Sequence, residues 1–201
     1  MSASDVAICN LALGHIGHST VISSLDEQSH AALRCRLVYA KCRDTLLETR
    51  DWSFARRFTA LASGGDAPDY WEHSYVYPTD CLKIRWLFDK DFDRQKDSRV
   101  PYQVALDKDG LTRLVWTNLE RAQARYTASV INASLFPASF RDALAYAVAK
   151  EIAYPLTTDH SIRSQIFQAY QLAMSKAAEL DGNQAEEIYD DWDPSWIVAR
   201  A

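Results

Sequence analysis

Hydrophobic residues recur at three- and four-residue steps in four stretches of the chain, which is the spacing of an amphipathic helix. The first stretch is Asp5–Ile16, where Ser4 is a suitable N-cap and the glycines at its end are helix breakers. The second is Asp26–Arg50, which Asp26 is able to cap. The expected inner face of this second helix carries Ala31, Cys35, Val38, Cys42 and Leu46.

Two further helices are predicted in the second half of the chain. Pro137, a residue favoured in a first helical turn, precedes the stretch Ala138–Tyr154, and Pro155 is expected to end or kink this helix. Asp159 is the expected cap of the stretch Asp159–Leu180. The apolar positions are Phe140, Leu144, Val148 and Ile152 in the third helix and Ile162, Ile166, Tyr170, Ala173 and Ala177 in the fourth.

The chain between these helical halves has no helical periodicity from about residue 62 to residue 133. Gly64, Gly65 and Pro68 mark a loop, and Asp109-Gly110 is typical of a β-hairpin turn. Short segments rich in aromatic and β-branched residues predict five strands. They are Trp71–Tyr77, Leu82–Phe88, Tyr102–Leu106, Leu111–Trp116 and Ala122–Val130.

The order of helices, strands and helices predicts an α+β fold in a single domain of residues 1–201. We expect residues 1–62 and 134–186 to form a mainly α-helical bundle. We expect residues 63–133 to form an inserted small antiparallel β subdomain.

The last fifteen residues, 187–201, are predicted to be an extended C-terminal arm that docks on another protein. Proline argues against a helix here, yet large apolar residues are frequent, and a solvated tail would not need them. The candidate partner-binding residues are Trp192, Pro194, Trp196, Ile197, Val198 and Arg200.

Composition and charge narrow the function classes. The chain is 48% hydrophobic with a net charge of −5, so it can bury a core but has no basic surface that would grip DNA. We interpret Arg56-Arg57 as a solvated helix end. Cys9, Cys35, Cys42 and Cys81 form no CxxC pair, so no disulfide framework is expected and a reducing compartment fits. Cys9, Cys35 and Cys42 lie in helical patterns and are interpreted as small hydrophobes. The first residues are not those of a signal peptide, and no apolar run is long enough for a membrane span.

Candidate catalytic and metal residues do not combine into a site, so we expect no catalytic group, no cofactor and no metal. Asp89-x-Asp91-x-Asp93 begins like a calcium loop, but Arg94 and Val100 stand where glycine and glutamate are needed. His15 and His18 have no further ligands at zinc spacing. The carboxylates Glu48, Asp51, Glu72 and Asp80 can be nominated for a hydrolase without any spacing to support them. Trp52 and Phe54 are interpreted as core.

Several phrases of the sequence resemble phage head-to-tail adaptor proteins, the family of tail tubular protein A and the packaged-DNA-stabilisation proteins. Ala7–Gly17 is similar to the "ICNxALxxIG" opening of that family, and Asp51–Ala55 to its "hxWxFA" phrase. Tyr75–Lys83 resembles "YxxPxDCLR", and Asp193–Arg200 resembles the "xxSWxxAR" ending. The resemblance extends over the first eighty residues and the C-terminus, and hardly over residues 89–130.

The resemblance implies a non-enzymatic virion protein at the head–tail junction, assembled in the bacterial host cytoplasm. It implies a homo-oligomeric ring, commonly a dodecamer, below the portal protein and above a downstream tail or nozzle protein. Double-stranded DNA would pass through the channel without sequence-specific binding. Two alternatives stay open: a cell-wall (peptidoglycan) hydrolase or bifunctional adaptor, and a soluble helical interaction protein outside any virion.

Overall fold

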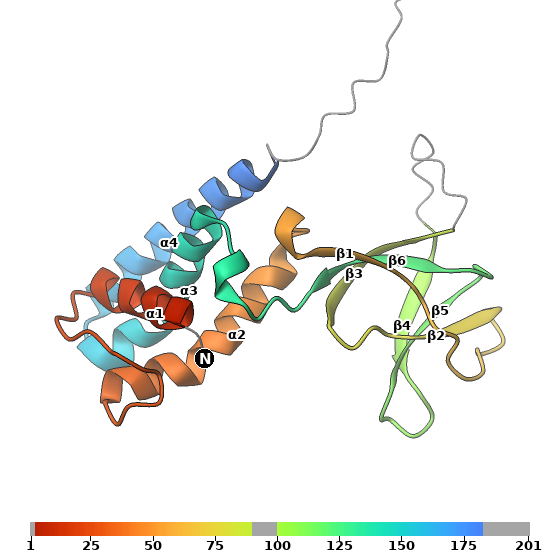
Figure 1. Ribbon diagram of the computed structural model, residues 1–201, viewed down its shortest axis with the longest axis horizontal. Helices are drawn as coiled ribbons and strands as arrows, with labels where there is room; N and C mark the ends of the chain where they lie inside the picture. Colours follow the sequence, from red (N-terminus) through yellow and green to blue (C-terminus); the bar gives the residue numbers. More distant parts are fainter. Residues whose placement is uncertain (1–2, 90–99, 183–201) are drawn as a thin grey trace, which may run out of the picture.

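The computed structural model describes residues 3–89 and 100–182, which form a helical lobe and a β lobe side by side (Figure 1). The helices are α1 (Ala3–His15), α2 (His30–Thr49), α3 (Ala138–Thr157) and α4 (His160–Gly182), with short 3-10 turns η1 (Ser53–Ala55) and η2 (Ala133–Leu135). The strands are β1 (Arg56–Ala60), β2 (His73–Val76), β3 (Cys81–Phe88), β4 (Tyr102–Leu106), β5 (Arg113–Thr117) and β6 (Gln123–Ala128). These elements confirm the predicted α+β fold class.

Helix α3 is the centre of the helical lobe, because α1, α2 and α4 all pack against it. The apolar ladder predicted for α3 is buried, and so are the small side chains on its other sides. The buried alanines are Ala143, Ala145, Ala147, Ala149 and Ala153. Small side chains let neighbouring helix axes approach closely, so α3 accepts three partners where the sequence pattern indicated one inner face. The prediction that N-terminal and C-terminal helices pack together is therefore confirmed.

Two predicted helix starts are wrong. Helix α1 already begins at Ala3, so Ser4 lies inside it. The N-cap of α2 is Ser29 and not Asp26, since the Ser29 hydroxyl accepts the N–H of Ala32 at 3.1 Å. Glu27 holds this cap, because its carboxylate accepts the Ser29 hydroxyl at 2.7 Å.

The boundary between α3 and α4 agrees better with prediction. Pro155 does not end α3, which continues to Thr157, since a proline in the last turn removes only one backbone donor. Thr158 then takes a left-handed conformation with φ 55°. Asp159 caps α4 as expected, accepting the N–H of Ser161 at 2.7 Å.

The β lobe consists of two three-stranded antiparallel sheets, in the orders β1-β6-β3 and β2-β5-β4. A second core lies in this lobe, with Leu87, Val115 and Ala124 fully buried. The Asp-Gly hairpin joins β4 to β5 as predicted, with Gly110 at φ 71°.

Two predictions are wrong where β1 lies. Residues 56–60 of the expected helical range 1–62 form this strand, and Arg56-Arg57 is not a helix end. Arg56 and Arg57 begin this strand, which pairs antiparallel with β6. Its partner lies almost seventy residues further along the chain, so no local pattern announces the pairing. The predicted C-terminal arm lies outside the described residues.

Candidate interaction surfaces

The two lobes are joined through Arg85 of β3, whose guanidinium lies against the C-terminal end of α2. It donates to the carbonyl oxygens of Leu47 at 3.3 Å and Glu48 at 3.1 Å, and also to that of Arg50. These carbonyls belong to the last turn of the helix and its cap, where no intrahelical donor remains. A cation at a helix C-terminus is also favoured by the helix dipole. Arg85 therefore fixes the β lobe to the bundle.

Asp51 strengthens the same junction from the loop after α2. Its carboxylate pairs with Arg125 of β6 and, at 3.4 Å, with Arg56 of β1. The Arg125 guanidinium in turn lies 3.7 Å from the centroid of the Trp86 ring. Burial lowers the pKa of Arg125, while the hydrogen bond and charge of Asp51 act in the opposite direction. All these groups are engaged with one another, so the junction is a structural feature.

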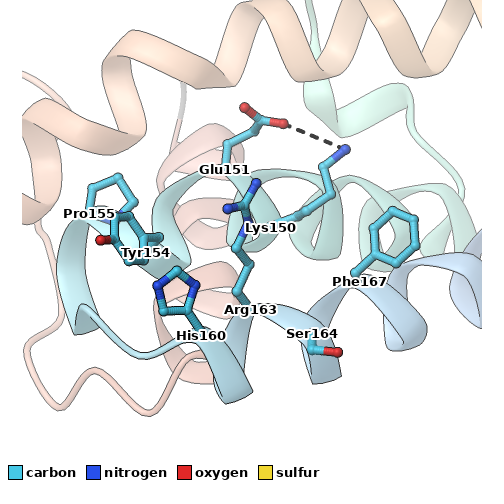
Figure 2. Close-up of a pocket in the computed structure, with 8 residues that line it drawn as sticks. All are labelled: Lys150, Glu151, Tyr154, Pro155, His160, Arg163, Ser164 and Phe167. Carbon is cyan, nitrogen blue, oxygen red and sulfur yellow. Dashed lines mark ion pairs between the residues drawn. The ribbon is translucent and has the colours of Figure 1, made fainter.

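A pocket of about 630 Å³ opens between the C-terminal half of α3 and the N-terminal half of α4 (Figure 2). Tyr154, Pro155 and His160 lie at one end of the pocket, Phe167 lies at the other, and Arg163 is between them. The Tyr154 and His160 rings are in contact, with centroids 4.8 Å apart. Aromatic walls around charged groups are typical of a protein or peptide binding site.

Two side chains supply positive groups to this pocket: Lys150 and Arg163. Among the described residues, Glu151 is the only carboxylate in its wall, and the ammonium of Lys150 lies 3.5 Å from it. The Lys150 ammonium also lies 4.8 Å from the centroid of the Tyr170 ring. Burial raises the pKa of Tyr170, so its hydroxyl stays protonated at neutral pH. The pocket thus has a positive balance on a protein whose net charge is −5.

Large apolar side chains are also exposed on two other parts of the helical lobe. Leu33 and Leu37 lie one turn apart on α2, and Leu37 is 64% exposed. Leu172 of α4 is 74% exposed and borders a groove toward Tyr146 of α3. The exposed side of α4 is rich in serine and glutamine: Ser161, Ser164, Gln165, Gln168, Gln171 and Ser175.

The structure separates the four carboxylates that a hydrolase interpretation would use. Asp51 belongs to the lobe junction, and Asp80 accepts hydrogen bonds from Arg57 at 2.5 Å and from the Tyr126 hydroxyl at 2.9 Å. Glu48 and Glu72 are exposed on different lobes. The described residues therefore do not gather these carboxylates around one cleft.

His15 and His18, the candidate metal ligands, make separate contacts within the fold. His15 stacks on Tyr146 with ring centroids 3.9 Å apart, and burial lowers its pKa while Asp142 raises it. His18 contacts the backbone of Thr20. Within residues 3–89 and 100–182, no three His, Cys, Asp or Glu side chains gather as a metal site.

All four cysteines are buried and free, which agrees with the interpretation of Cys9, Cys35 and Cys42 as small hydrophobes. Burial raises the pKa of Cys42 to about 11 and that of Cys81 to about 11, so both thiols stay protonated at neutral pH. Trp52 and Phe54 belong to the core, as predicted. Both rings pack edge-on against Phe140, with ring centroids 5.1 Å and 4.8 Å from its centroid.

The partner-binding residues predicted on the arm, from Trp192 to Arg200, lie outside the described residues. Sequence reasoning missed the pocket between α3 and α4. The sequence did contain an indication of this pocket. Tyr154 and Phe167 are aromatic residues outside the predicted apolar faces of their helices, and both are exposed.

Comparisons with known proteins do not assign the chain to a family. No protein-family model matches it, and no curated protein matches it at a significant level. No helix among the described residues has the length and apolar character needed to cross a membrane.

Proposed function

We propose that this protein is a structural component of a tailed-bacteriophage particle, a head-to-tail adaptor that assembles as a ring below the portal. In this proposal the ring, commonly of twelve copies, retains packaged DNA and offers an attachment surface to a downstream tail or nozzle protein. The protein would act in the virion, after assembly in the bacterial cytoplasm.

The observation that carries the proposal is the joint order of the adaptor-like phrases along the chain. In the first phrase Ile8, Cys9, Ala12 and Leu13 are all buried. In the second, Trp52 is buried and donates to the carbonyl oxygen of Leu46 at 2.9 Å. The first two phrases thus coincide with buried framework residues of the fold.

The exposed surfaces agree with this role. A ring requires a heterologous interface, in which one face of each subunit contacts a different face of the next. Leu33 and Leu37 expose apolar area on α2, while Phe167 and Leu172 expose it on α4. Two separate apolar areas on different helices are what such an interface needs. The net charge of −5 also suits a channel through which DNA slides, since a basic channel would hold the phosphates.

We do not propose the hydrolase alternative, because Asp51 and Asp80 are held by arginines. The interaction-protein alternative differs from the adaptor only in its partner, so the experiment must supply the partner. Purified full-length protein is mixed with a portal ring and examined by electron microscopy. We expect closed rings seated coaxially on the portal. Failure to co-assemble over a range of protein concentrations would overturn the proposal.

A further inference from the structure

The pocket between α3 and α4 contains a cation that the described part of the chain leaves without a counter-ion. Glu151 already contacts two lysines, Lys150 at 3.5 Å and Lys41 at 4.0 Å. No carboxylate of residues 3–89 or 100–182 lies within ion-pairing distance of the Arg163 guanidinium. The pocket therefore presents a free guanidinium next to exposed aromatic rings, a combination suited to an acidic peptide with apolar side chains.

The segment that follows α4 has the complementary chemistry. Residues 186–191 read Glu-Glu-Ile-Tyr-Asp-Asp, with four carboxylates around one isoleucine and one tyrosine. No other six consecutive residues of this chain contain four acidic residues. We propose that the pocket between α3 and α4 binds the segment 186–191 of a second copy of this chain.

The carboxylates of the segment and its two apolar side chains each have matching groups in the pocket. Its carboxylates pair with Arg163 and with Lys150, whose ammonium is shared with Glu151. Tyr189 or Ile188 covers Phe167 and Tyr154, which are 47% and 44% exposed without it. An arginine fork binds a carboxylate through two parallel hydrogen bonds, which gives the contact direction as well as energy.

The second copy is favoured over the same chain by reach. Helix α4 rises by about 1.5 Å per residue, so Phe167 lies about 22 Å and His160 about 33 Å from Gly182. A strand advances at most about 3.3 Å per residue, so Glu187 reaches about 17 Å beyond Gly182 and Asp191 about 30 Å. Along the helix axis the first two carboxylates therefore stop short of their own pocket, and the last two reach Arg163, about 28 Å from Gly182, only with the chain nearly straight. A neighbouring copy has no such limit.

The contact is head-to-tail, because the pocket lies along the N-terminal half of α4 and the segment follows the C-terminal end of the same helix in the sequence. Repeated between copies, a head-to-tail contact closes into a ring when the rotation permits. The inference deepens the proposed function and rests on it for the closed ring. The contact between two copies of the chain can also be measured without a portal protein.

The direct test places a photo-activated benzophenone amino acid at position 167 of the full-length protein. Equal amounts of isotopically light and heavy protein are mixed, irradiated and digested with trypsin. We expect cross-links to the peptide 177–200, which contains the segment, with light–heavy pairs as frequent as same-label pairs. Same-label pairs alone would mean that each chain fills its own pocket, and cross-links elsewhere or none would mean that the segment does not bind. Either result overturns the inference.

A charge exchange provides the second test. The pair Lys150→Glu and Arg163→Glu should weaken self-association by about tenfold, measured by sedimentation. Replacing the four acidic residues at positions 186, 187, 190 and 191 with lysine should weaken self-association as much. A chain that combines the pocket and segment substitutions should self-associate like the unmodified protein. Lys176→Glu is the matched control, an exposed lysine on α4 outside the pocket, and should change nothing. Loss of association without recovery in the combined chain would overturn the inference.

The two proposals fail in different experiments. Rings on the portal without cross-links from position 167 would remove only the pocket contact. Cross-links between copies without any portal complex would remove only the adaptor role.

Discussion

Asp181, at the end of α4, accepts two hydrogen bonds from Ser53 at the start of η1. The backbone N–H of Ser53 donates at 2.9 Å and its hydroxyl at 2.7 Å. Asp181 is almost fully buried, and Arg50 lies 3.9 Å from its second oxygen. The last helix is thus attached to the junction that joins the bundle to the β lobe.

Replacing Asp181 with alanine should lower the free energy of unfolding by about 1–3 kcal/mol. The physical reason is that the partly buried N–H and hydroxyl of Ser53 lose their acceptor at Asp181. A urea melt followed by circular dichroism measures the change. Glu179→Ala is the matched control, because Glu179 is an exposed acidic residue of the same helix and should cost less than about 0.5 kcal/mol. Equal effects of the two changes would show that the contact contributes nothing.

Leu144 and Ile166 should be core residues energetically as well as geometrically. Leu144 is 0% exposed in α3, and Ile166 is 6% exposed in α4. Alanine at either position should lower the free energy of unfolding by about 2–5 kcal/mol, through lost burial and the cavity left behind. Leu172→Ala, at a leucine that is 74% exposed, is the control. A loss below about 1 kcal/mol at Leu144 would contradict the packing of α3 at the centre of the lobe.

Glu27 should make stability depend on pH in the acid range. Hydrogen bonds from Ser29 and then Ser23 lower its pKa from 4.5 to about 2. A carboxylate with a depressed folded-state pKa stabilises the protein above its unfolded-state value, and this contribution is lost as pH falls from about 4.5 to about 2. Unfolding should be measured at intervals over that range for the unmodified protein and for Glu27→Gln. The glutamine variant should lose part of the pH dependence, whereas parallel curves would exclude the effect.

The helical half of the fold was predictable because its signals are local. Ladders such as Phe140 to Ile152 and the cap at Asp159 can be read within a few turns of helix. The cap of α2 was misplaced because Asp26 and Ser29 are both good capping residues. The choice between them depends on Glu27, which holds the Ser29 hydroxyl.

The parts that were missed depend on distant partners. Strand β1 forms because it pairs with β6, and the sequence of neither strand indicates that the other is its partner. The pocket between α3 and α4 likewise depends on tertiary packing, since Tyr154 and Phe167 line one pocket only when the two helices fold back on each other. The charge balance of this pocket could not be predicted from the sequence either, because it depends on the ion pair between Lys41 of α2 and Glu151 of α3.

DNA binding by the assembled protein should be weak at physiological salt. The chain has 22 basic and 27 acidic residues, so it provides few phosphate contacts and little counter-ion release. Fluorescence anisotropy with a labelled duplex measures this directly, with a basic DNA-binding protein as the positive control. Binding tighter than non-specific levels, in the micromolar range or below, would contradict a neutral or negative channel surface.

The C-terminal residues 192–201 should be needed for portal binding and not for folding. Removing them after Asp191 keeps the described core and the segment 186–191, so the melting temperature should hardly change. Portal binding should be lost, since buried tryptophans commonly contribute about 2 kcal/mol or more each to an interface. Trp192→Ala and Trp196→Ala should each weaken binding in a pull-down or interferometry measurement with the portal ring, while Ser195→Ala serves as the control within the same segment. A longer truncation after Gln184 should leave folding intact and remove the contact between copies as well. If either truncated protein unfolds, or if the shorter truncation binds the portal as tightly as the full chain, the arm does not have this role.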